Sequence, residues 1–374
     1  MEEEFYWLKE IEFLGKHLQI LMQSNNGPCP LLAIANVLIL RGQLKIHQDF
    51  SNLSHEHLVT LVADKLLELN RIDENDPNYS NLQANLSDAI AIIPKLQEGI
   101  DVNVKFDDIN SFEFTTEIEV FDLMKIQLVH AWVVEKDSEI EKAIGKMSYN
   151  QIQEVLVRCE ELKNKENLDA EETEFVRKGR VIAEFLENSA SQMTEEGLRR
   201  LNTEIPDGRI CVLFRNNHFS TLVKHNKKVY ILATDLGFRD ADQITWERLS
   251  KIAGDNKYCN SYFQKIINSA SNSPDKVINV DEKQAITDFI DHQNKIDEDE
   301  ESKKKAKIEE EDASLALALS LQEKELYMKE KEERKHKANE RSNRREGLQS
   351  KNRVGLQQKK EKKEKKEKKK CVIW

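Results

Sequence analysis

Residues 23–40 read Q-S-N-N-G-P-C-P-L-L-A-I-A-N-V-L-I-L. The second half of this stretch is apolar on nearly every side and is interrupted only by Asn36, which predicts a helix in the middle of a core. Pro30 fits the first position of that helix, and Gly42 fits its end. Cys29 therefore lies where a loop becomes a buried helix.

Cys29 has two interpretations at this position. Unpaired N–H groups and the positive end of the helix dipole favour the thiolate, which is the reactive form of cysteine. Gln23 lies in the same loop, so its amide is placed to return to Cys29 and donate to a developing oxyanion. The alternative is that Cys29 is a small buried hydrophobe, the usual role of a free cysteine.

Length and charge limit the number of domains and the kinds of partner that the chain can have. The 374 residues are enough for one large domain or two ordinary ones. Residues 302–374 hold 24 Lys/Arg and 14 Asp/Glu, a net charge of +10; the whole chain carries −11, so residues 1–301 carry −21. This acidic body argues against nucleic acid as the main partner and allows either a basic protein partner or simple solubility.

The five cysteines are scattered and form no C-x-x-C pair, which argues against a disulfide framework and a zinc knuckle; they are Cys29, Cys159, Cys211, Cys259 and Cys371. We expect no metal and no organic cofactor. Residues 1–5 do not form a basic and apolar signal, and no apolar run is long enough to span a membrane. A reducing setting, cytoplasmic or nuclear, is therefore expected.

Hydrophobic periodicity predicts the elements that surround the central helix. Strands are expected at 18–22 and 100–106, helices at 54–70 and 82–98, and a mainly helical region at 138–200. Ser54 is a suitable N-cap for the first helix. The apolar segment 121–134 is expected to be buried, and its His130 is interpreted as a core histidine rather than a catalytic one.

A second informative region follows the helical one. Residues 209–215 predict a strand, and 216–224 and 228–237 predict a hairpin with its turn near Asn226.

The register assumed for this hairpin determines the partner of a histidine. If Lys224 faces Lys228, paired residue numbers sum to about 452, which places His218 opposite Thr234 and beside Asp235. A neutral imidazole held by an acidic or hydroxyl neighbour is the base that a thiol nucleophile requires.

The chain changes character after about residue 270. We expect a catalytic domain over 1–270, an acidic linker over 271–302, a charged helical segment over 303–346 and a polybasic tail over 347–374. The charged C-terminal region that bears the helical motif is expected to be largely disordered.

Within the helical segment, residues 309–323 read E-E-E-D-A-S-L-A-L-A-L-S-L-Q-E. An acidic cluster precedes a short apolar helix, which favours binding to a partner. The alternative is one part of a long solvated or coiled helix, although sustained heptads are lacking. The residues that share one face of the helix are Leu315, Ala316, Leu319, Ser320 and Glu323.

The last four residues read C-V-I-W after a run of lysines. Cys371 thus stands in a C-a-a-X arrangement, with the basic run as a second membrane signal. The alternative is a solvated basic tail.

Several of these pieces together resemble the MINDY family of deubiquitinases. The resemblance covers roughly residues 5–265 and rests on five sequences: Q-S-N-N-G-P-C-P-L-L-A-I-A-N-V-L, F-E-F-T-T-E-I-E-V-F-D-L-M-K-I-Q-L-V-H-A-W-V-V, K-M-S-Y-N-Q, F-R-N-N-H-F-S-T-L, and T-D-L-G-F with the following W-E-R-L. It implies an α+β fold that is a papain-like cysteine protease variant. The implied substrate is polyubiquitin of the linkage type that marks proteins for the proteasome.

The resemblance also implies roles for individual residues. Cys29 would be the nucleophile, His218 the general base and Gln23 an oxyanion donor. The third catalytic group is open: Asp235 is preferred, with Thr234 and Asn217 as alternatives.

Two further features bear on function. Residues 309–323 resemble a ubiquitin-interacting motif. Leu236 stands where the family pattern commonly has Gln, and loss of an orienting amide there would reduce activity. The alternatives are therefore a catalytically inactive ubiquitin-chain-binding protein and, less favoured, a cysteine acyltransferase.

Overall fold

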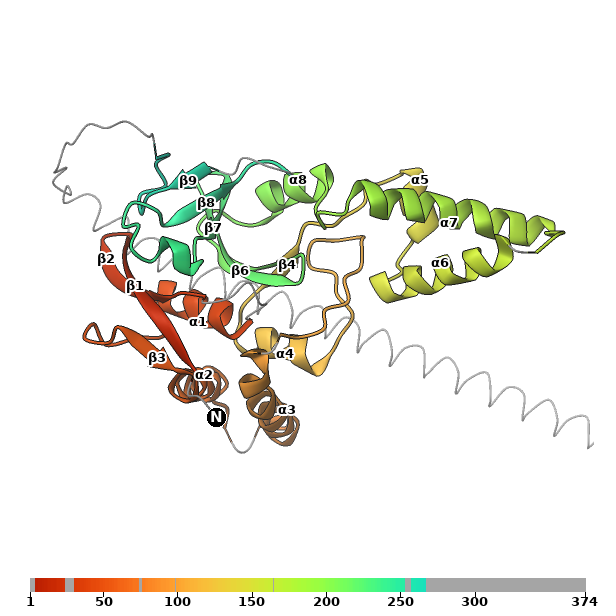
Figure 1. The fold of residues 1–374 in the computed structure, drawn as a ribbon. Helices are drawn as coiled ribbons and strands as arrows, with labels where there is room; N and C mark the ends of the chain where they lie inside the picture. The colour runs from red at the N-terminus through yellow and green to blue at the C-terminus, as the bar shows by residue number, and fades with distance from the viewer. Residues whose placement is uncertain are drawn as a thin grey trace, which may run out of the picture. The chain divides into compact units, whose positions relative to one another are not determined.

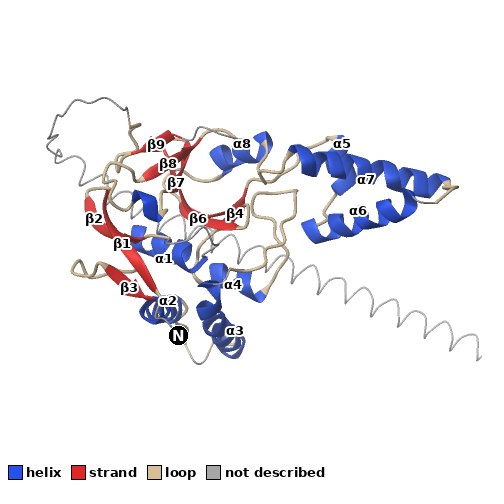
Figure 2. Cartoon of the chain, in the orientation of Figure 1, coloured by secondary structure: helices blue, strands red, loops and turns tan. Residues whose placement is uncertain are grey.

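The computed structural model describes residues 4–23, 30–73, 76–97, 99–163, 165–252 and 257–266. All of them belong to the compact unit Met1–Asp297. Helices and strands are both abundant, which confirms the predicted α+β class (Figure 2). Cys29, the linker, the 309–323 motif and Cys371 lie outside the described residues.

The smaller sheet is antiparallel and has the order β2-β1-β3. Its strands are β1 (Phe5–Phe13), β2 (Lys16–Leu21) and β3 (Asn52–Ser54). Leu14 and Gly15 both have positive φ, which fits the tight turn between β1 and β2. The strand predicted at 18–22 is confirmed as the end of β2.

The larger sheet has the order β4-β5-β6-β7-β8-β9. The β4–β5 pair is parallel and the other pairs are antiparallel. The strands are β4 (Leu128–His130), β5 (Ile210–Arg215), β6 (His218–His225), β7 (Lys228–Leu232), β8 (Trp246–Leu249) and β9 (Lys257–Cys259).

Helix α1 (Pro30–Leu40) forms the centre of the core, as predicted, and all of its residues are buried. It packs against β5 and β6 of the larger sheet and against β2 of the smaller one. Figure 1 shows α1 between the two groups of strands. Because protein surrounds the helix, it has no polar face and is apolar nearly all round. The chain leaves the helical path at Gly42, whose φ of 72° suits glycine.

Five of the other described helices, α2, α4, α5, α7 and α8, begin at a residue whose side chain caps them. Ser54 accepts a hydrogen bond from the amide of His57, as predicted for α2. The predicted helix at 82–98 is found as α3 followed by a short 3₁₀ segment, η1. The bounds are α2 (His55–Leu69), α3 (Tyr79–Ile92), η1 (Ile93–Gln97), α4 (Thr116–Leu123), α5 (Glu139–Ile144), α6 (Tyr149–Lys163), α7 (Ala170–Asn188) and α8 (Glu195–Glu204).

Helices α5 to α8 confirm the mainly helical region at 138–200. Helices α6 and α7 pack as a pair that extends away from the strands (Figure 1). They approach closely at Gly179, where an added Cβ would lie 2.1 Å from the Sγ atom of Cys159. Among the described helices, none combines the length and the apolar character needed to cross a bilayer.

The strand predicted at 100–106 is wrong. The backbone there makes only isolated bridges, Val104 with Phe112 and Lys105 with Ser148. The alternation that predicted a strand arises because Val104 and Phe106 are buried while Lys105 is not. The alternation holds only from Val104 to Phe106, because Asn103 is buried next to Val104, and the segment makes isolated bridges instead of pairing along a strand.

His130 is a buried core histidine, as predicted. Its Nδ1 atom accepts a hydrogen bond from the amide of Trp132 at 3.1 Å, and its Nε2 atom lies 3.1 Å from the carbonyl oxygen of Ser111. A neutral imidazole with its proton on Nε2 satisfies both contacts. Burial lowers the pKa of His130 to about 4.

Candidate active site

The register of the β6–β7 hairpin differs by one residue from the predicted one. Asn226 and Lys227 have φ values of 49° and 61° and form a two-residue turn of the type typical of hairpins. His225 therefore pairs with Lys228, and paired residue numbers sum to 453 rather than 452. The expectation that Lys224 faces Lys228 assumed a longer turn and is wrong.

His218 is the first residue of β6 and follows a second tight turn. Asn216 and Asn217 have φ values of 52° and 58°, and Arg215 pairs with His218 across this turn. Asparagine tolerates this left-handed conformation better than most residues. The two asparagines thus hold the half-buried His218 at the end of the sheet.

The N-terminus of α1 points toward this same end of the sheet. The hydroxyl of Thr221 donates to the carbonyl oxygen of Ala33, in the first turn of α1, at 3.2 Å. Beyond the other end of the helix, Arg41 donates to the carbonyl oxygen of Ile210 at 2.7 Å. Ile210 pairs with Val223, which lies farther from the His218 end of β6 than Thr221 does. The start of α1, at Pro30, is therefore the end of the helix nearer to His218.

Gln23 is joined by its backbone to the segment that follows β7. Its amide donates to the carbonyl oxygen of Thr234 at 2.7 Å, and its carbonyl oxygen accepts from the amide of Leu236 at 3.1 Å. These bonds form a parallel bridge between Gln23 and Asp235. Since β7 runs antiparallel to β6, its final residues lie at the end of the sheet where β6 begins. Gln23, Asp235 and His218 are therefore gathered at one end of the larger sheet.

Asn36 fixes the two stems of the loop that carries Cys29. Its side chain accepts a hydrogen bond from the amide of Leu21 at 2.8 Å and donates to the carbonyl oxygen of the same residue at 3.0 Å. Leu21 ends the strand before Gln23, and Asn36 lies within the helix after Cys29. The one polar residue of the apolar stretch thus joins α1 to the end of β2, a role that its position in a buried helix did not reveal.

Asp235 caps the short 3₁₀ segment η2 (Leu236–Phe238). Its Oδ1 atom accepts a hydrogen bond from the amide of Gly237 at 2.7 Å. Extending the observed register past its last pair would bring His218 opposite Asp235, whereas the predicted register brought it opposite Thr234. The side chain of Leu236 packs against the main hydrophobic cluster. Asn217, the other alternative for the third group, is exposed in the turn before His218.

Strand alternation limits how His218 can act. Phe219 and Val223 belong to the cluster that contains α1, whereas Leu222 belongs to the cluster on the other face of the sheet. His218 has the parity of Leu222. Strand alternation therefore directs its side chain to the face opposite α1, and His218 lies at the end of the sheet beside the turn.

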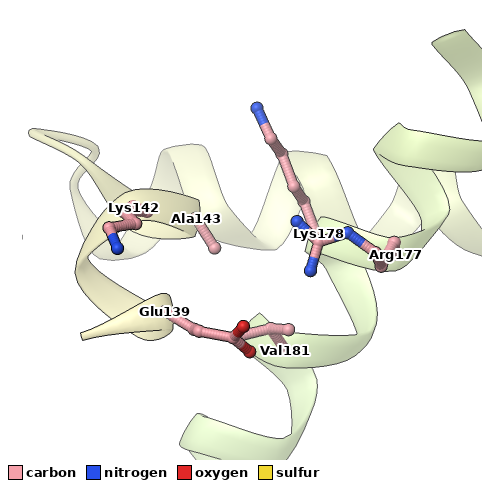
Figure 3. Close-up of a pocket in the computed structure, with 6 residues that line it drawn as sticks. All are labelled: Glu139, Lys142, Ala143, Arg177, Lys178 and Val181. Atoms are coloured by element: carbon pink, nitrogen blue, oxygen red, sulfur yellow. The ribbon is translucent and has the colours of Figure 1, made fainter.

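A surface pocket elsewhere contains none of the predicted site residues. It lies between α5 and α7, and Figure 3 shows the six residues that line it, Glu139, Lys142, Ala143, Arg177, Lys178 and Val181. The described residues also hold no cluster of three or more His, Cys, Asp and Glu side chains suited to a metal ion.

The chain is similar in sequence to known proteins. A sequence model described as "MINDY deubiquitinase" matches residues 4–263. Ubiquitin carboxyl-terminal hydrolase MINDY-1 of Homo sapiens is 39% identical over 263 residues, covering 70% of this chain and 54% of the relative. The same enzyme of Pongo abelii is 38% identical, with 76% and 61% covered. Ubiquitin carboxyl-terminal hydrolase MINDY-2 of Mus musculus is 39% identical, with 70% and 42% covered. This chain thus spans about half the length of these relatives.

Proposed function

Because the chain belongs to the MINDY deubiquitinase family, we propose that it is a cysteine isopeptidase that hydrolyses polyubiquitin. The observation that carries the proposal is the gathering of Gln23, Asp235 and His218 at the sheet end toward which the N-terminus of α1 points. A thiol nucleophile, a base and an amide donor are the groups that acyl transfer requires.

In the proposed mechanism, the Cys29 thiolate attacks the isopeptide carbonyl between a ubiquitin C-terminus and a lysine. The amide side chain of Gln23 and a backbone N–H near Cys29 stabilise the oxyanion of the tetrahedral intermediate. His218 protonates the departing lysine amine, which leaves a thioester on Cys29. His218 then takes a proton from water, and the resulting attack releases the ubiquitin C-terminus and restores the Cys29 thiolate beside a protonated His218.

Two structural features support these roles. Cys29 directly precedes in sequence the helix that begins at Pro30, and the positive end of a helix dipole favours the thiolate of a cysteine in that position. Gln23 is held through both of its backbone polar groups, so the direction in which its side chain leaves the backbone is fixed. We assign the third catalytic role to Asp235, whose carboxylate has accepting capacity beyond the single bond to Gly237.

The finer substrate assignment is polyubiquitin of the proteasome-targeting linkage, with no role for nucleic acid. We propose that residues 309–323 add a second ubiquitin contact through the helix face that contains Leu315, Ala316, Leu319, Ser320 and Glu323. The active site would bind one linkage, and the helix at 309–323 would bind a neighbouring ubiquitin of the same chain. Because the second contact is then intramolecular, the two contacts together would favour long chains.

We further propose a cytoplasmic enzyme, with the nucleus as an alternative, that associates with membranes through a prenylated Cys371. A single lipid chain binds membranes only marginally. Nine lysines between residues 359 and 370 would supply the second, electrostatic signal.

The alternative function is an inactive protein that binds ubiquitin chains and keeps the fold. Leu236 is the observation that favours it, because an aliphatic side chain stands where relatives of this pattern commonly place an amide. Incubation of the full-length protein with tetraubiquitin separates the two functions, with Cys29→Ala as the control. If chains are bound but not cut, Leu236→Gln is the first substitution to test for restored turnover.

A further inference from the structure

Lys9 is a buried lysine in the middle of β1, with only 4% of its surface exposed. Its ammonium group donates three hydrogen bonds to backbone carbonyl oxygens, those of Phe238 at 2.6 Å, Ala241 at 2.9 Å and Ile244 at 2.7 Å. An ammonium has three donors, so all of them are used. A buried charge is tolerated only when it is satisfied in this way.

All three acceptors belong to one segment, residues 236–244, which begins with η2 and leads to β8. A second contact holds the same segment from β1, since the guanidinium of Arg239 lies 3.9 Å from the centre of the Trp7 ring. Burial lowers the pKa of Lys9, and the nearby Asp242 and Asp240 oppose that change. Lys9 therefore anchors this segment to the smaller sheet as a charged group surrounded by carbonyl dipoles.

The anchored segment begins beside Gln23. The amide of Leu236 donates to the carbonyl oxygen of Gln23, and the amide of Met22 donates to the carbonyl oxygen of Trp7. Gln23 thus lies between β1 on one side and residues 234–236 on the other. Lys9 joins these two sides through its contacts with Phe238, Ala241 and Ile244.

We propose that Lys9 is a positioning residue that holds the 236–244 segment, and through it Gln23, in the geometry that oxyanion stabilisation requires. The proposal rests on the proposed function, in which Gln23 donates to the oxyanion. Contacts made only in the transition state affect kcat rather than KM. Displacing a catalytic group by about 1 Å can cost roughly 100-fold in rate.

Lys224 offers a matched control for the test. It is also buried, with 3% of its surface exposed, and its ammonium donates to the carbonyl oxygens of Asn202 and Ile205. Those carbonyls lie at the end of α8, and Lys224 lies at the turn end of β6, away from His218. Burial lowers the pKa of Lys224 as it does that of Lys9. Replacing either lysine by Met removes a satisfied buried charge and keeps most of the side-chain volume.

The experiment compares Lys9→Met and Lys224→Met in the full-length protein, at a temperature where thermal melts show both to be folded. Tetraubiquitin cleavage gives kcat and KM, and hydrogen exchange reports on peptides covering 18–23 and 232–244. For Lys9→Met we expect a fall in kcat of about 10- to 100-fold with KM within about twofold. Exchange should be faster in both peptides. Lys224→Met should show neither change.

Equal kcat values for the two variants, or unchanged exchange in Lys9→Met, would overturn the proposal. Lys9→Arg, which keeps the charge, should recover part of the lost kcat. If Lys9→Met does not fold, Arg239→Gln loosens the same segment from the exterior, and an unchanged kcat in that variant contradicts the proposal. If the wild type cuts no chain, the proposed function fails, while the exchange measurement still decides whether Lys9 holds Gln23.

Discussion

Gln23 and Asp235 are partners in a parallel β-bridge, although Gln23 precedes helix α1 and Asp235 follows the β6–β7 hairpin. The bridge joins the smaller sheet to the end of the larger one, beside the start of β6. Two sequence motifs that lie far apart in the chain are therefore held together by main-chain hydrogen bonds rather than by side chains. Substitution of either side chain should consequently alter chemistry more than it alters the backbone geometry.

The first prediction concerns the two hydrogen bonds between the Asn36 side chain and the backbone of Leu21. Replacing Asn36 with Leu should lower the free energy of unfolding by about 2–5 kcal/mol, because each buried polar group left without a partner costs about 1–3 kcal/mol. The two groups are the amide and the carbonyl of Leu21. Urea denaturation of the two proteins measures the difference.

Asn85 is the matched control for this substitution. It is exposed, and its side chain donates to Glu119 on the surface. Asn85→Leu should change the free energy of unfolding by no more than about 0.5 kcal/mol. Similar decreases in the free energy of unfolding for the two variants would show that the hydrogen bonds between Asn36 and Leu21 do not stabilise the fold as proposed.

The second prediction is an acid sensitivity due to His130. Its pKa falls from 6.5 to about 4 in the folded protein because burial disfavours the charged ring. The unfolded chain therefore takes up a proton at higher pH than the folded one. The stabilisation is fully present above pH 6.5 and is lost as the pH falls from 6.5 to about 4. At pH 5 the loss should be about 2 kcal/mol, from about 1.4 kcal/mol per pH unit.

A variant comparison isolates this effect from other titrating groups. His130→Gln keeps one donor and one acceptor but does not titrate, so its stability should fall less between pH 7 and pH 5. His17→Gln removes an exposed histidine and should keep the wild-type acid sensitivity. The His130 account is wrong if all three proteins lose the same stability over this range.

Sequence reasoning predicted the elements whose signal is local. The apolar run before Gly42, the Ser54 cap and the buried His130 each follow from residue type and spacing, and the structure confirms them. The hairpin register was missed by one residue because it depends on the turn conformation of Asn226 and Lys227.

Contacts between residues far apart in the sequence cannot be predicted from local residue patterns. Periodicity identifies a buried face but not its neighbour, so 100–106 was predicted as a strand. The contacts of Asn36 with Leu21 and of Lys9 with Phe238 join segments with no shared pattern. For Asn36 the signal in the sequence is only a polar residue within an apolar stretch, which does not identify its partner.

The third prediction concerns the helix at 309–323. Replacing Ala316 with Leu, or Ser320 with Asp, should reduce capture of polyubiquitin in a pull-down and slow cleavage of long chains. The bulky or charged side chain would obstruct the proposed ubiquitin-facing surface. Labelling of Cys29 by a ubiquitin with a thiol-reactive C-terminus should stay at the wild-type rate. Unchanged chain binding in both variants would remove this helix from the account.

The fourth prediction concerns Cys371. If this residue is prenylated, part of the wild-type protein should pellet with membranes, and Cys371→Ser should be recovered in the soluble fraction. Intact mass spectrometry of the protein from cells should show the added lipid. A soluble wild type whose C-terminal peptide has the unmodified mass would contradict the prenylation proposal.

The most direct test of the central claim is cleavage of tetraubiquitin by the purified full-length protein, measured for each linkage type. We predict that chains of the proteasome-targeting linkage are cut best, that Cys29→Ala abolishes cleavage, and that His218→Ala lowers it strongly. Gln23→Ala should lose about 10²–10³ in rate, the usual effect of removing one oxyanion donor. Chains that are bound but left intact, together with no labelling of Cys29 by the thiol-reactive ubiquitin, would contradict the account.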